Sequence, residues 1–393
     1  MRKLFIFLTL FLIVVNINAQ TLIATSVHPE ATANQNQRKI VRDSADNVYV
    51  VFEDIINQEN VIKGVVFNKI TGQWNNAIYI NNGKNPTLSI CKNGQIHLIY
   101  ESNDSLTKIK HTSTFDFQIW TPDLIISDSL FKSELPVADA DSAGKLNVFW
   151  IQKNDSISES LIYACISNNN QINSKVISTK ADIKNIAIAN HLQYLKNDLI
   201  FAFHFNQDSL QFFRSTDYLT NYDTIYKTIG TQPCITYNSI TPSVNNHDST
   251  DFTLRLLYID VDYQLIEIEY IACYDWIYSK TLQLEIIDYV CVDDILPPIG
   301  YSYLFLKNGT LYHGFSYGGL EYSTILDTIL TNPIYPSIAY KTFNFSYIDF
   351  IWMENNGNGF NVFYKRDAKH IWVGLEDNEL GKGFTITGFP NPF

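Results

Sequence analysis

The sequence predicts an all-β fold, a β-propeller of seven four-stranded blades, from three observations. One pattern, a short polar turn followed by an apolar run that ends in an aromatic residue, recurs seven times. Successive turns lie mostly about 50 residues apart, the length of four short strands with their connections. Aromatic residues make up 14% of a chain with only 17 glycines in 393 residues, a composition that suits half-buried strands. Four-stranded units repeated in this way are typical of propeller blades.

Two other strand arrangements fit the repeat less well. A parallel solenoid would show shorter periods and few hairpin turns, and a β-sandwich would not repeat one unit seven times. The sixth repeat is irregular over Asp293–Pro298 and its fourth strand is barely present, so six or eight blades remain alternatives.

The first 19 residues are predicted to be a secretory signal peptide. Met1–Lys3 give a positive start, and Leu4–Val15 form an apolar stretch too short to span a bilayer comfortably. Asn18-Ala19 provide a small-residue cleavage site before Gln20, with no cysteine there for a lipid anchor. No later run of about 20 apolar residues follows. We therefore expect an exported protein with no membrane span after cleavage.

Each repeat opens with two strands on either side of the polar turn. The first is often led by a proline, which is tolerated at the first residue of a strand. These prolines are Pro86, Pro136, Pro242, Pro298 and Pro336. The second strands are Val48–Phe52, Ile96–Tyr100, Leu146–Trp150, Leu199–Phe203, Phe252–Tyr258, Leu311–Phe315 and Tyr347–Trp352.

A third strand and a more polar fourth strand complete each repeat. The fourth often carries a large aromatic residue, at Trp74, Trp120, Tyr222, Trp276 and Trp372. The third strands are Val61–Phe67, Thr107–His111, Ser160–Ile166, Leu210–Arg214, Leu265–Ala272, Leu320–Ile325 and Phe360–Lys365.

The last repeat, Tyr335–Trp372, shows the four-strand pattern most clearly and is expected to close the ring. A propeller must join its ends to protect its terminal strand edges. We predict that Thr21–Thr25 adds the closing strand, with the repeat's own fourth strand at Trp372 as the alternative. The propeller then occupies residues 20–373, followed by a polar linker over 374–388.

Charge and cysteine content limit the partners and the redox chemistry. A net charge of −12 and a pI near 5.1 argue against nucleic acid, which selects clustered lysine and arginine. The five cysteines show no C-x-x-C spacing, and an odd number leaves at least one unpaired. We expect these cysteines to be buried in strands, where they pack as small hydrophobic residues. A single disulfide between Cys234 and Cys291 is the alternative.

Candidate binding residues lie at the ends of the second strands. In an antiparallel blade the turn after the second strand and the link to the next blade emerge on one face, so these ends should converge around one mouth of the channel. Carboxylates beside aromatic side chains suit a neutral sugar, and paired carboxylates could also cleave a glycosidic bond. Solvated strand ends are the alternative. The residues are Glu53, Asp54, Glu101, Gln152, His204, Asp260, Asp262, Ser316 and Glu354.

Metal and cofactor sites find no support in the sequence. Asp139–Gly144 begins like a calcium loop, but Ala143 replaces a ligand and Trp150 stands where the closing Glu belongs, so we expect a hairpin turn. His97, His204 and His313 have no metal-ligand spacing. No nucleophile or phosphate-loop motif occurs, so we predict no catalytic residue, metal or cofactor.

Two worn turn motifs resemble those of the sialidase-like, or BNR-repeat, propellers. Ser215–Tyr222 resembles that family's Asp-box, S-x-D-x-G-x-T-W, with Leu219, Asn221 and Tyr222 in place of Gly, Thr and Trp. Ser113–Trp120 keeps the same interval from the serine to the aromatic residue, but its Asp116 stands one residue later than the Asp of the box. The resemblance spans about residues 38–373 and implies a structural role for the box.

Sialidase members of that family clamp a carboxylate with three arginines, and open with an F-R-I-P motif. This chain has no such motif, and lysine does not reproduce a guanidinium fork. We therefore do not expect sialidase activity. After the predicted signal peptide its arginines are Arg38, Arg42, Arg214, Arg255 and Arg366.

The C-terminus carries a second resemblance. Phe389–Phe393, FPNPF, resembles the opening of the C-terminal sorting domain of the type IX secretion system. The resemblance implies a truncated sorting domain over residues 389–393, with the secretion machinery as partner and a secreted or cell-surface location reached through the periplasm.

Together these observations predict an exported, monomeric, non-catalytic propeller that presents a binding face to a glycan or a protein. The alternative is a glycoside hydrolase or lyase that uses paired carboxylates at the mouth. A third hypothesis, a purely structural spacer, predicts a narrow channel plugged by side chains.

Overall fold

The computed structural model describes most of the chain from Gln20 to Ala368. No helix occurs among these residues, and hence no helix that could cross a membrane. The predicted signal peptide, linker and sorting segment lie outside them. The described ranges are 20–34, 36–141, 143–154, 158–167, 170–180, 182–190, 199–206, 209–239, 252–271, 276–283, 287–292, 301–317, 320–325, 332–339 and 347–368.

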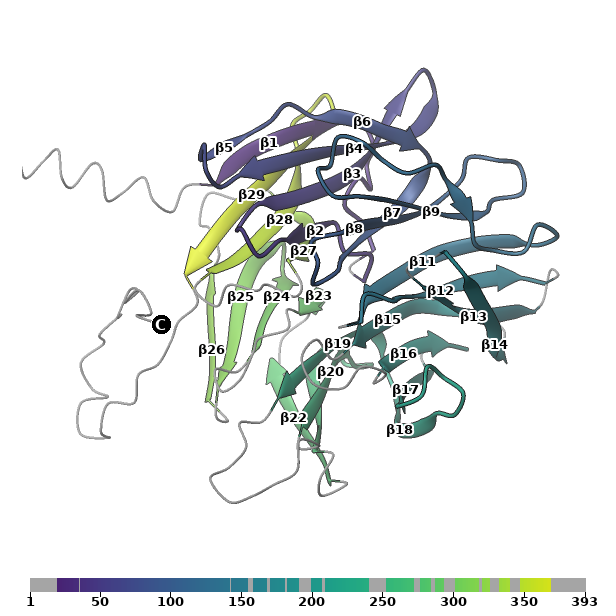
Figure 1. The fold of residues 1–393 in the computed structure, drawn as a ribbon. Helices are drawn as coiled ribbons and strands as arrows, with labels where there is room; N and C mark the ends of the chain where they lie inside the picture. The colour runs from purple at the N-terminus through teal and green to yellow at the C-terminus, as the bar shows by residue number, and fades with distance from the viewer. Residues whose placement is uncertain are drawn as a thin grey trace, which may run out of the picture.

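Seven antiparallel sheets stand as blades around a central axis (Figure 1), which confirms the predicted seven-bladed propeller. The first strands of neighbouring blades contact one another, so they line the axis. Blades one to three consist of β2 (Ile40–Arg42), β3 (Val48–Ile56), β4 (Glu59–Asn68), β5 (Gln73–Trp74) and β6 (Ile78–Asn82); β7 (Lys84–Ile90), β8 (Ile96–Glu101), β9 (Ile109–Thr114) and β10 (Leu124–Ile125); and β11 (Lys132–Ala140), β12 (Leu146–Lys153), β13 (Glu159–Ile166) and β14 (Ile172–Lys180).

Blade one differs from the others because β5 and β6 both pair with β4.

Blades four to six consist of β15 (Lys184–Asn190), β16 (Leu199–Phe205), β17 (Ser209–Ser215) and β18 (Asp223–Ile229); β19 (Thr231–Ser239), β20 (Phe252–Ile259), β21 (Leu265–Ile271) and β22 (Trp276–Gln283); and β23 (Ile287–Val292), β24 (Tyr301–Lys307), β25 (Thr310–Tyr317) and β26 (Leu320–Ile325).

Blade seven joins the two ends of the described chain. Its strands are β27 (Ile334–Ile338), β28 (Tyr347–Asn355), β29 (Phe360–Ala368) and, from the N-terminus, β1 (Thr21–Ser26). β1 runs antiparallel to β29, with Thr21 opposite Tyr364 and Ser26 opposite Phe360. This pairing confirms closure by the N-terminal strand. Trp372, the alternative, lies outside the described residues.

The apolar runs form strands because both of their faces are covered. Every residue of β8 and β16 is buried, whereas the rim strand β18 is exposed or half-buried throughout. Between blades three and four, aromatic rings interlock: the ring centroids of Phe149 and Phe201 lie 4.9 Å apart, and those of Phe201 and Phe213 lie 4.8 Å apart. The core therefore consists of layers between blades.

In the sixth repeat, each predicted strand is in fact the next strand of the blade. Leu311–Phe315 lies in β25, the third strand rather than the second, and Leu320–Ile325 is the fourth strand rather than the third. The polar turn at Asn308 and Gly309 joins the second and third strands, and both residues have positive φ, 51° and 71°. An Asn-Gly hairpin turn looks alike wherever it falls in a blade.

The prolines lie at a bulge inside the first strand of a blade, not at the first residue of that strand as predicted. The register of the first strand shifts at this point in blades two, three, five and seven, and the residue before each proline has positive φ. A bulge leaves an unpaired position where proline's missing N–H costs little. Blade five uses a proline within β19, and the predicted Pro242 and Pro298 lie outside the described residues. The bulge prolines are Pro86, Pro136, Pro233 and Pro336.

The cysteines in the described residues form no disulfide. Cys234 and Cys291 belong to neighbouring first strands, but the Cys234 thiol lies 3.0 Å from the Val290 carbonyl oxygen and is not bonded to Cys291. The alternative of a Cys234–Cys291 disulfide is therefore wrong in this structure. Cys91, Cys165, Cys234 and Cys291 are all buried, as expected of small core residues, and Cys273 lies outside the described residues.

Candidate functional site

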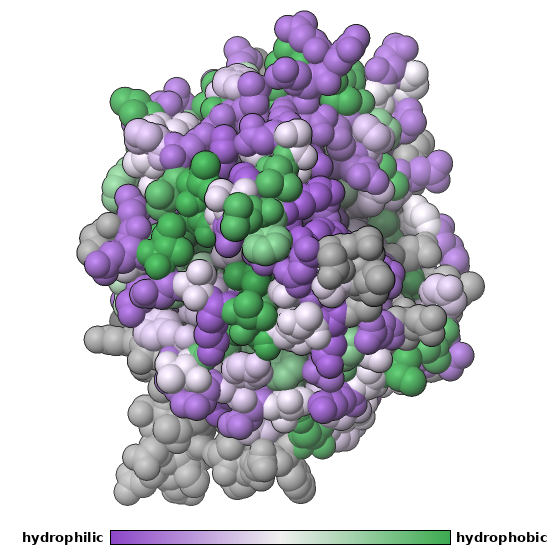
Figure 2. All heavy atoms as spheres, turned by 90° about the vertical axis from the view of Figure 1, so that its right-hand side faces the viewer, coloured by the Kyte–Doolittle hydropathy of each residue, from purple (hydrophilic) through white to green (hydrophobic). Residues whose placement is uncertain are grey.

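The mouth of the ring is the face on which the second strands end. Turns between second and third strands emerge there with the links between blades. Figure 2 looks at the side where β6 ends and the link to blade two begins; hydrophilic side chains cover most of it, with separate hydrophobic patches between them. The predicted residues on second strands are Glu53 and Asp54 in β3, Glu101 in β8, Gln152 in β12, His204 in β16 and Glu354 in β28.

Three predicted residues lie on other segments. Asp260 and Asp262 form the turn after β20, where Asp260 Oδ1 accepts hydrogen bonds from the backbone N–H groups of Asp262 (2.9 Å) and Gln264 (2.8 Å). Ser316 was expected at the mouth, but it lies near the end of the third strand β25, which runs away from the mouth. The error follows from the misplaced hairpin of the sixth repeat.

A segment between β1 and β2, Asn34 with Asn36–Lys39, fills the central channel; we call it the plug. Asn36 Nδ2 donates to the Pro233 carbonyl in blade five (2.7 Å), and Gln37 Nε2 donates to the Pro136 carbonyl in blade three (3.1 Å). Lys39 Nζ donates to the Pro86 carbonyl in blade two (2.6 Å). The channel is thus closed by side chains, as the structural-spacer hypothesis expects.

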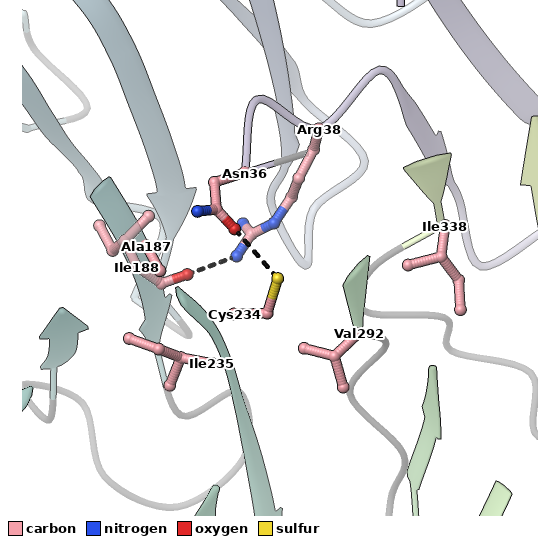
Figure 3. A pocket seen from close by; sticks show the side chains of 8 residues that line it. All are labelled: Asn36, Arg38, Ala187, Ile188, Cys234, Ile235, Val292 and Ile338. Atoms are coloured by element: carbon pink, nitrogen blue, oxygen red, sulfur yellow. Dashed lines mark hydrogen bonds between the residues drawn. The ribbon is translucent and has the colours of Figure 1, made fainter. Parts of the chain in front are cut away.

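Arg38 anchors the plug to blades three and four. Its Nη1 lies 2.6 Å from Asp139 Oδ1, and its Nη2 donates to the Ile188 carbonyl at 2.7 Å (Figure 3). The cavity left beside Arg38 and Cys234 measures about 20 Å³. That is room for about one water molecule, so the channel itself is too small to hold a sugar.

Glu53 and Glu101 meet around Asn85, near the start of the first strand of blade two. Glu53 Oε1 accepts the backbone N–H of Asn85 (2.9 Å), and Glu101 Oε1 accepts Asn85 Nδ2 (2.7 Å). Glu101 Oε1 also accepts the backbone N–H of Leu135 (2.7 Å), at the start of blade three. Both carboxylates are therefore engaged by the backbone of the following blade.

Charge is balanced within this cluster by two lysines. Lys84 Nζ lies 3.5 Å from Glu101 Oε2. The fully buried Lys39 interacts electrostatically with both Glu53 and Glu101. Burial raises the pKa of the Glu53 and Glu101 carboxyls and lowers the pKa of the Lys39 ammonium, while the opposite charges counteract these shifts.

The other predicted mouth residues make local contacts. Asp54 Oδ1 accepts Ser26 Oγ (3.2 Å) and the Val27 N–H (2.9 Å), which ties β1 to blade one. Burial opposes ionisation of Asp54, but hydrogen bonds to it, first from Lys63, hold its pKa below the usual value. Gln152 Nε2 donates a hydrogen bond to Asn154 Oδ1, and Trp352 Nε1 donates one to Glu354 Oε1. His204 is buried and lies opposite Lys184 in the neighbouring strand.

A groove of about 330 Å³ opens at the mouth between blades one and two, directly beside Glu101. Asn103 Nδ2 donates to the Asn60 carbonyl at 2.7 Å and joins its two sides. The sequence prediction missed these loop residues, although a run of polar residues follows both second strands and could have indicated them. The groove is lined by Gln58, Glu59, Asn60, Lys84, Ser102, Asn103, Asp104 and Thr107.

The motifs singled out in the sequence form turns. Asp141 Oδ1 accepts the N–H groups of Ala143 (2.8 Å) and Lys145 (2.9 Å) in the β11–β12 hairpin, and no cluster of potential metal ligands occurs in the described part of the chain. In the worn box between β17 and β18, Asp217 Oδ1 accepts the Asn221 N–H (2.8 Å). Asp116 Oδ1 accepts the Ile119 N–H (2.9 Å) between β9 and β10.

Comparison with known proteins gives likeness of fold alone. No family model and no curated protein sequence matches the chain. Among solved structures, a polysaccharide lyase described as PL25 ulvan lyase bound to -[GlcA(1-4)Rha3S]- matches with a TM-score of 0.60 and 12% identity, over 88% of this chain and 95% of that one. The polysaccharide lyase Uly1 matches at 0.53 and 10%, over 88% and 91%. A Hadza microbial sialidase matches at 0.47 and 12%, over 81% and 73%.

Proposed function

We propose that this protein is an exported or cell-surface propeller that binds a glycan at the groove between blades one and two. The observation that carries the proposal is the groove itself: about 330 Å³ at the mouth, lined by amides, hydroxyls and charged groups around the β3–β4 and β8–β9 turns and by Lys84 at the start of β7. This volume falls in the usual range for small-ligand sites, whereas the plugged channel offers no room. Sugar hydroxyls both donate and accept, which matches such a lining.

Catalysis is not part of this proposal because the mouth carboxylates are occupied by the protein itself. Glu53 and Glu101 are buried, with 3% and 1% exposure, and neither lines the groove. Their Oε1 atoms hold backbone N–H groups at the entrance of the next blade. A general base or nucleophile must instead reach the substrate within hydrogen-bond distance.

A polysaccharide lyase is the second candidate. Two structures of similar fold are described as polysaccharide lyases, and burial raises the pKa of Glu53 toward the range of a general base. Incubation with uronate-containing polysaccharides would reveal a lyase by the ultraviolet absorbance of its unsaturated product, and a hydrolase by new reducing ends. We expect neither signal. A signal that Glu53→Gln abolishes would establish the enzyme.

The test of the binding proposal is a glycan screen with the whole purified chain. The double variant Asn103→Ala/Asp104→Ala changes two exposed groove residues and should weaken binding of any hit about tenfold. Lys92→Ala is the control: this exposed residue lies in the β7–β8 turn, on the opposite face of the same blade. Absence of any glycan hit would refute the proposal and favour a protein partner, and equal binding by the groove variant would refute the assignment to the groove.

The location of the protein belongs to the same proposal. Its support is the sequence of residues 1–19, with a positive start and an apolar stretch, and the FPNPF segment at 389–393. Residues 1–393 followed by a complete type IX sorting domain should appear outside a host cell that has this secretion system. Deletion of residues 2–19 should retain it in the cytoplasm.

A further inference from the structure

The groove is acidic, and its one basic lining residue is already paired. Among the eight lining residues, Glu59 and Asp104 carry carboxylates and only Lys84 carries an ammonium. Lys84 Nζ lies 3.5 Å from Glu101 Oε2, a carboxylate that is buried behind it. A ligand in the groove therefore meets more negative than positive charge.

Arginine, the residue best suited to carboxylate or sulfate groups, is committed elsewhere. Its planar fork binds such anions through two parallel hydrogen bonds, which a lysine does not reproduce. No arginine lines the groove. Four of the arginines in the described part of the chain are bound to carboxylates elsewhere in the ring: Arg38 to Asp139 (2.6 Å), Arg42 to Asp349 (2.8 Å), Arg255 to Glu267 (2.8 Å) and Arg366 to Asp349 (2.7 Å).

The other lining groups suit hydroxyls. Gln58, Asn60 and Asn103 offer amide groups that both donate and accept, and Ser102 and Thr107 offer hydroxyls. The carboxylates of Glu59 and Asp104 accept hydrogen bonds from hydroxyl groups, but they repel another carboxylate or a sulfate.

We propose that the groove selects an uncharged, hydroxyl-rich saccharide unit and excludes glycans that carry uronate or sulfate groups. This inference rests on the proposed glycan-binding function and names its substrate class. The ligand bound in the PL25 structure, -[GlcA(1-4)Rha3S]-, carries both a uronate and a sulfate, so the inference separates this chain from that protein despite the similar fold.

The experiment measures binding of immobilised protein to two panels of polysaccharides at low and high salt. The neutral panel contains dextran, galactan, xylan and mannan, and the anionic panel contains polygalacturonate, alginate and dextran sulfate. We expect binding to at least one neutral member, little changed by salt, and none to the anionic panel. Anionic binding equal to or tighter than neutral binding would overturn the inference and leave the glycan function standing. Binding to neither panel would overturn both.

A charge reversal provides an independent readout. The double variant Glu59→Lys/Asp104→Lys changes the net charge of the groove by four units at exposed positions. It should gain at least about tenfold in affinity for the anionic panel, and high salt should remove that gain. Asp182→Lys is the control, since this exposed carboxylate lies at the link between blades three and four, outside the groove. An equal gain in the control would contradict the assignment to the groove.

Discussion

At the scale of single residues, Cys91, His97 and His111 form a buried chain of hydrogen bonds between blades two and three. The Cys91 Sγ atom lies 3.2 Å from His97 Nε2, and His97 Nδ1 lies 2.9 Å from His111 Nε2. The thiol also reaches the Gly144 carbonyl of blade three, at 3.8 Å. One assignment of protons satisfies all three contacts: His111 donates to His97, His97 to the sulfur, and the thiol to the carbonyl. Both histidines are then neutral.

This chain predicts a loss of stability in acid. Burial lowers the pKa of His97 to about 3 and that of His111 to about 4, whereas both titrate near 6.5 in the unfolded chain. Below pH 6.5 the unfolded state therefore binds more protons, so the free energy of unfolding falls as the pH is lowered toward 4. The expected loss is on the order of 1.4 kcal/mol per pH unit for each histidine.

Melting temperatures between pH 7 and pH 4.5 test the prediction. The double variant His97→Gln/His111→Gln removes both titrating groups, so its melting temperature should start lower at pH 7 but decline less steeply with acid. The carboxylates titrate in the same way in both proteins, so their contribution cancels in the comparison. Parallel curves would show that the histidines do not drive the acid response.

At the scale of elements, the bulge of each first strand turns carbonyl groups toward the channel. The innermost strand is an edge, so its polar backbone groups need partners. The carbonyls of Pro86, Pro136 and Pro233 accept hydrogen bonds from three plug side chains, and the Tyr335 carbonyl accepts Thr32 Oγ1 at 2.8 Å. The repeated prolines are thus part of how the ring holds its N-terminal segment.

The link before the first strand has no space for a side chain, which gives a second prediction. A Cβ atom on Gly83 would lie 2.5 Å from the Tyr100 ring and 2.6 Å from the Glu101 carbonyl oxygen, and a carbonyl cannot turn aside as a side chain can. Gly83→Ala should therefore destabilise the protein by about 1–3 kcal/mol. It should also weaken glycan binding, because a shift of Gly83 moves Lys84, the next residue, which lines the groove. Thermal melting and the glycan assay measure the two effects.

Gly230→Ala is the matched control for this prediction. Gly230 holds the same place before blade five, where a Cβ would lie 2.3 Å from the Tyr258 ring and 2.8 Å from the Ile259 carbonyl oxygen. This variant should lose similar stability but keep its glycan binding, since its link is far from the groove in the ring order. Equal loss of binding in both variants would indicate general unfolding rather than a local effect.

Strands were predictable where a local pattern determined them. The buried apolar runs such as β8 and β16 were found because a short run covered on both faces needs only apolar residues. The sixth repeat was misread because its Asn308-Gly309 turn follows the second strand, whereas comparable turns elsewhere follow the first. Turn chemistry fixes a hairpin but not its place in the blade.

At the scale of the whole molecule, the plug could not be predicted because the contacts that hold it in the channel join it to six blades, most of them distant in sequence. Its side chains reach blades two, three, four and five, and its backbone reaches blades one and seven: the Lys39 carbonyl accepts the Val51 N–H, and the Lys39 N–H lies 3.4 Å from Ser337 Oγ. The candidate groove was missed for a related reason. It exists only where loops of two blades meet, whereas the strand ends such as Glu53 and Glu101 could be placed from one blade.

Ring closure gives the prediction that belongs to the whole molecule. Removal of residues 20–27 would expose the edge of β29 and delete the ladder from Thr21 to Ser26, together with the contacts of Ser26 and Val27 to Asp54. At about 1 kcal/mol for each lost hydrogen bond, the cost is roughly 5 kcal/mol. For a chain of this size the melting temperature should fall by about 5–10 °C. Deletion of eight residues at the other end, 386–393, provides the control and should leave the melting temperature unchanged. A small effect of the N-terminal deletion would mean that the plug, rather than β1, holds the ring closed.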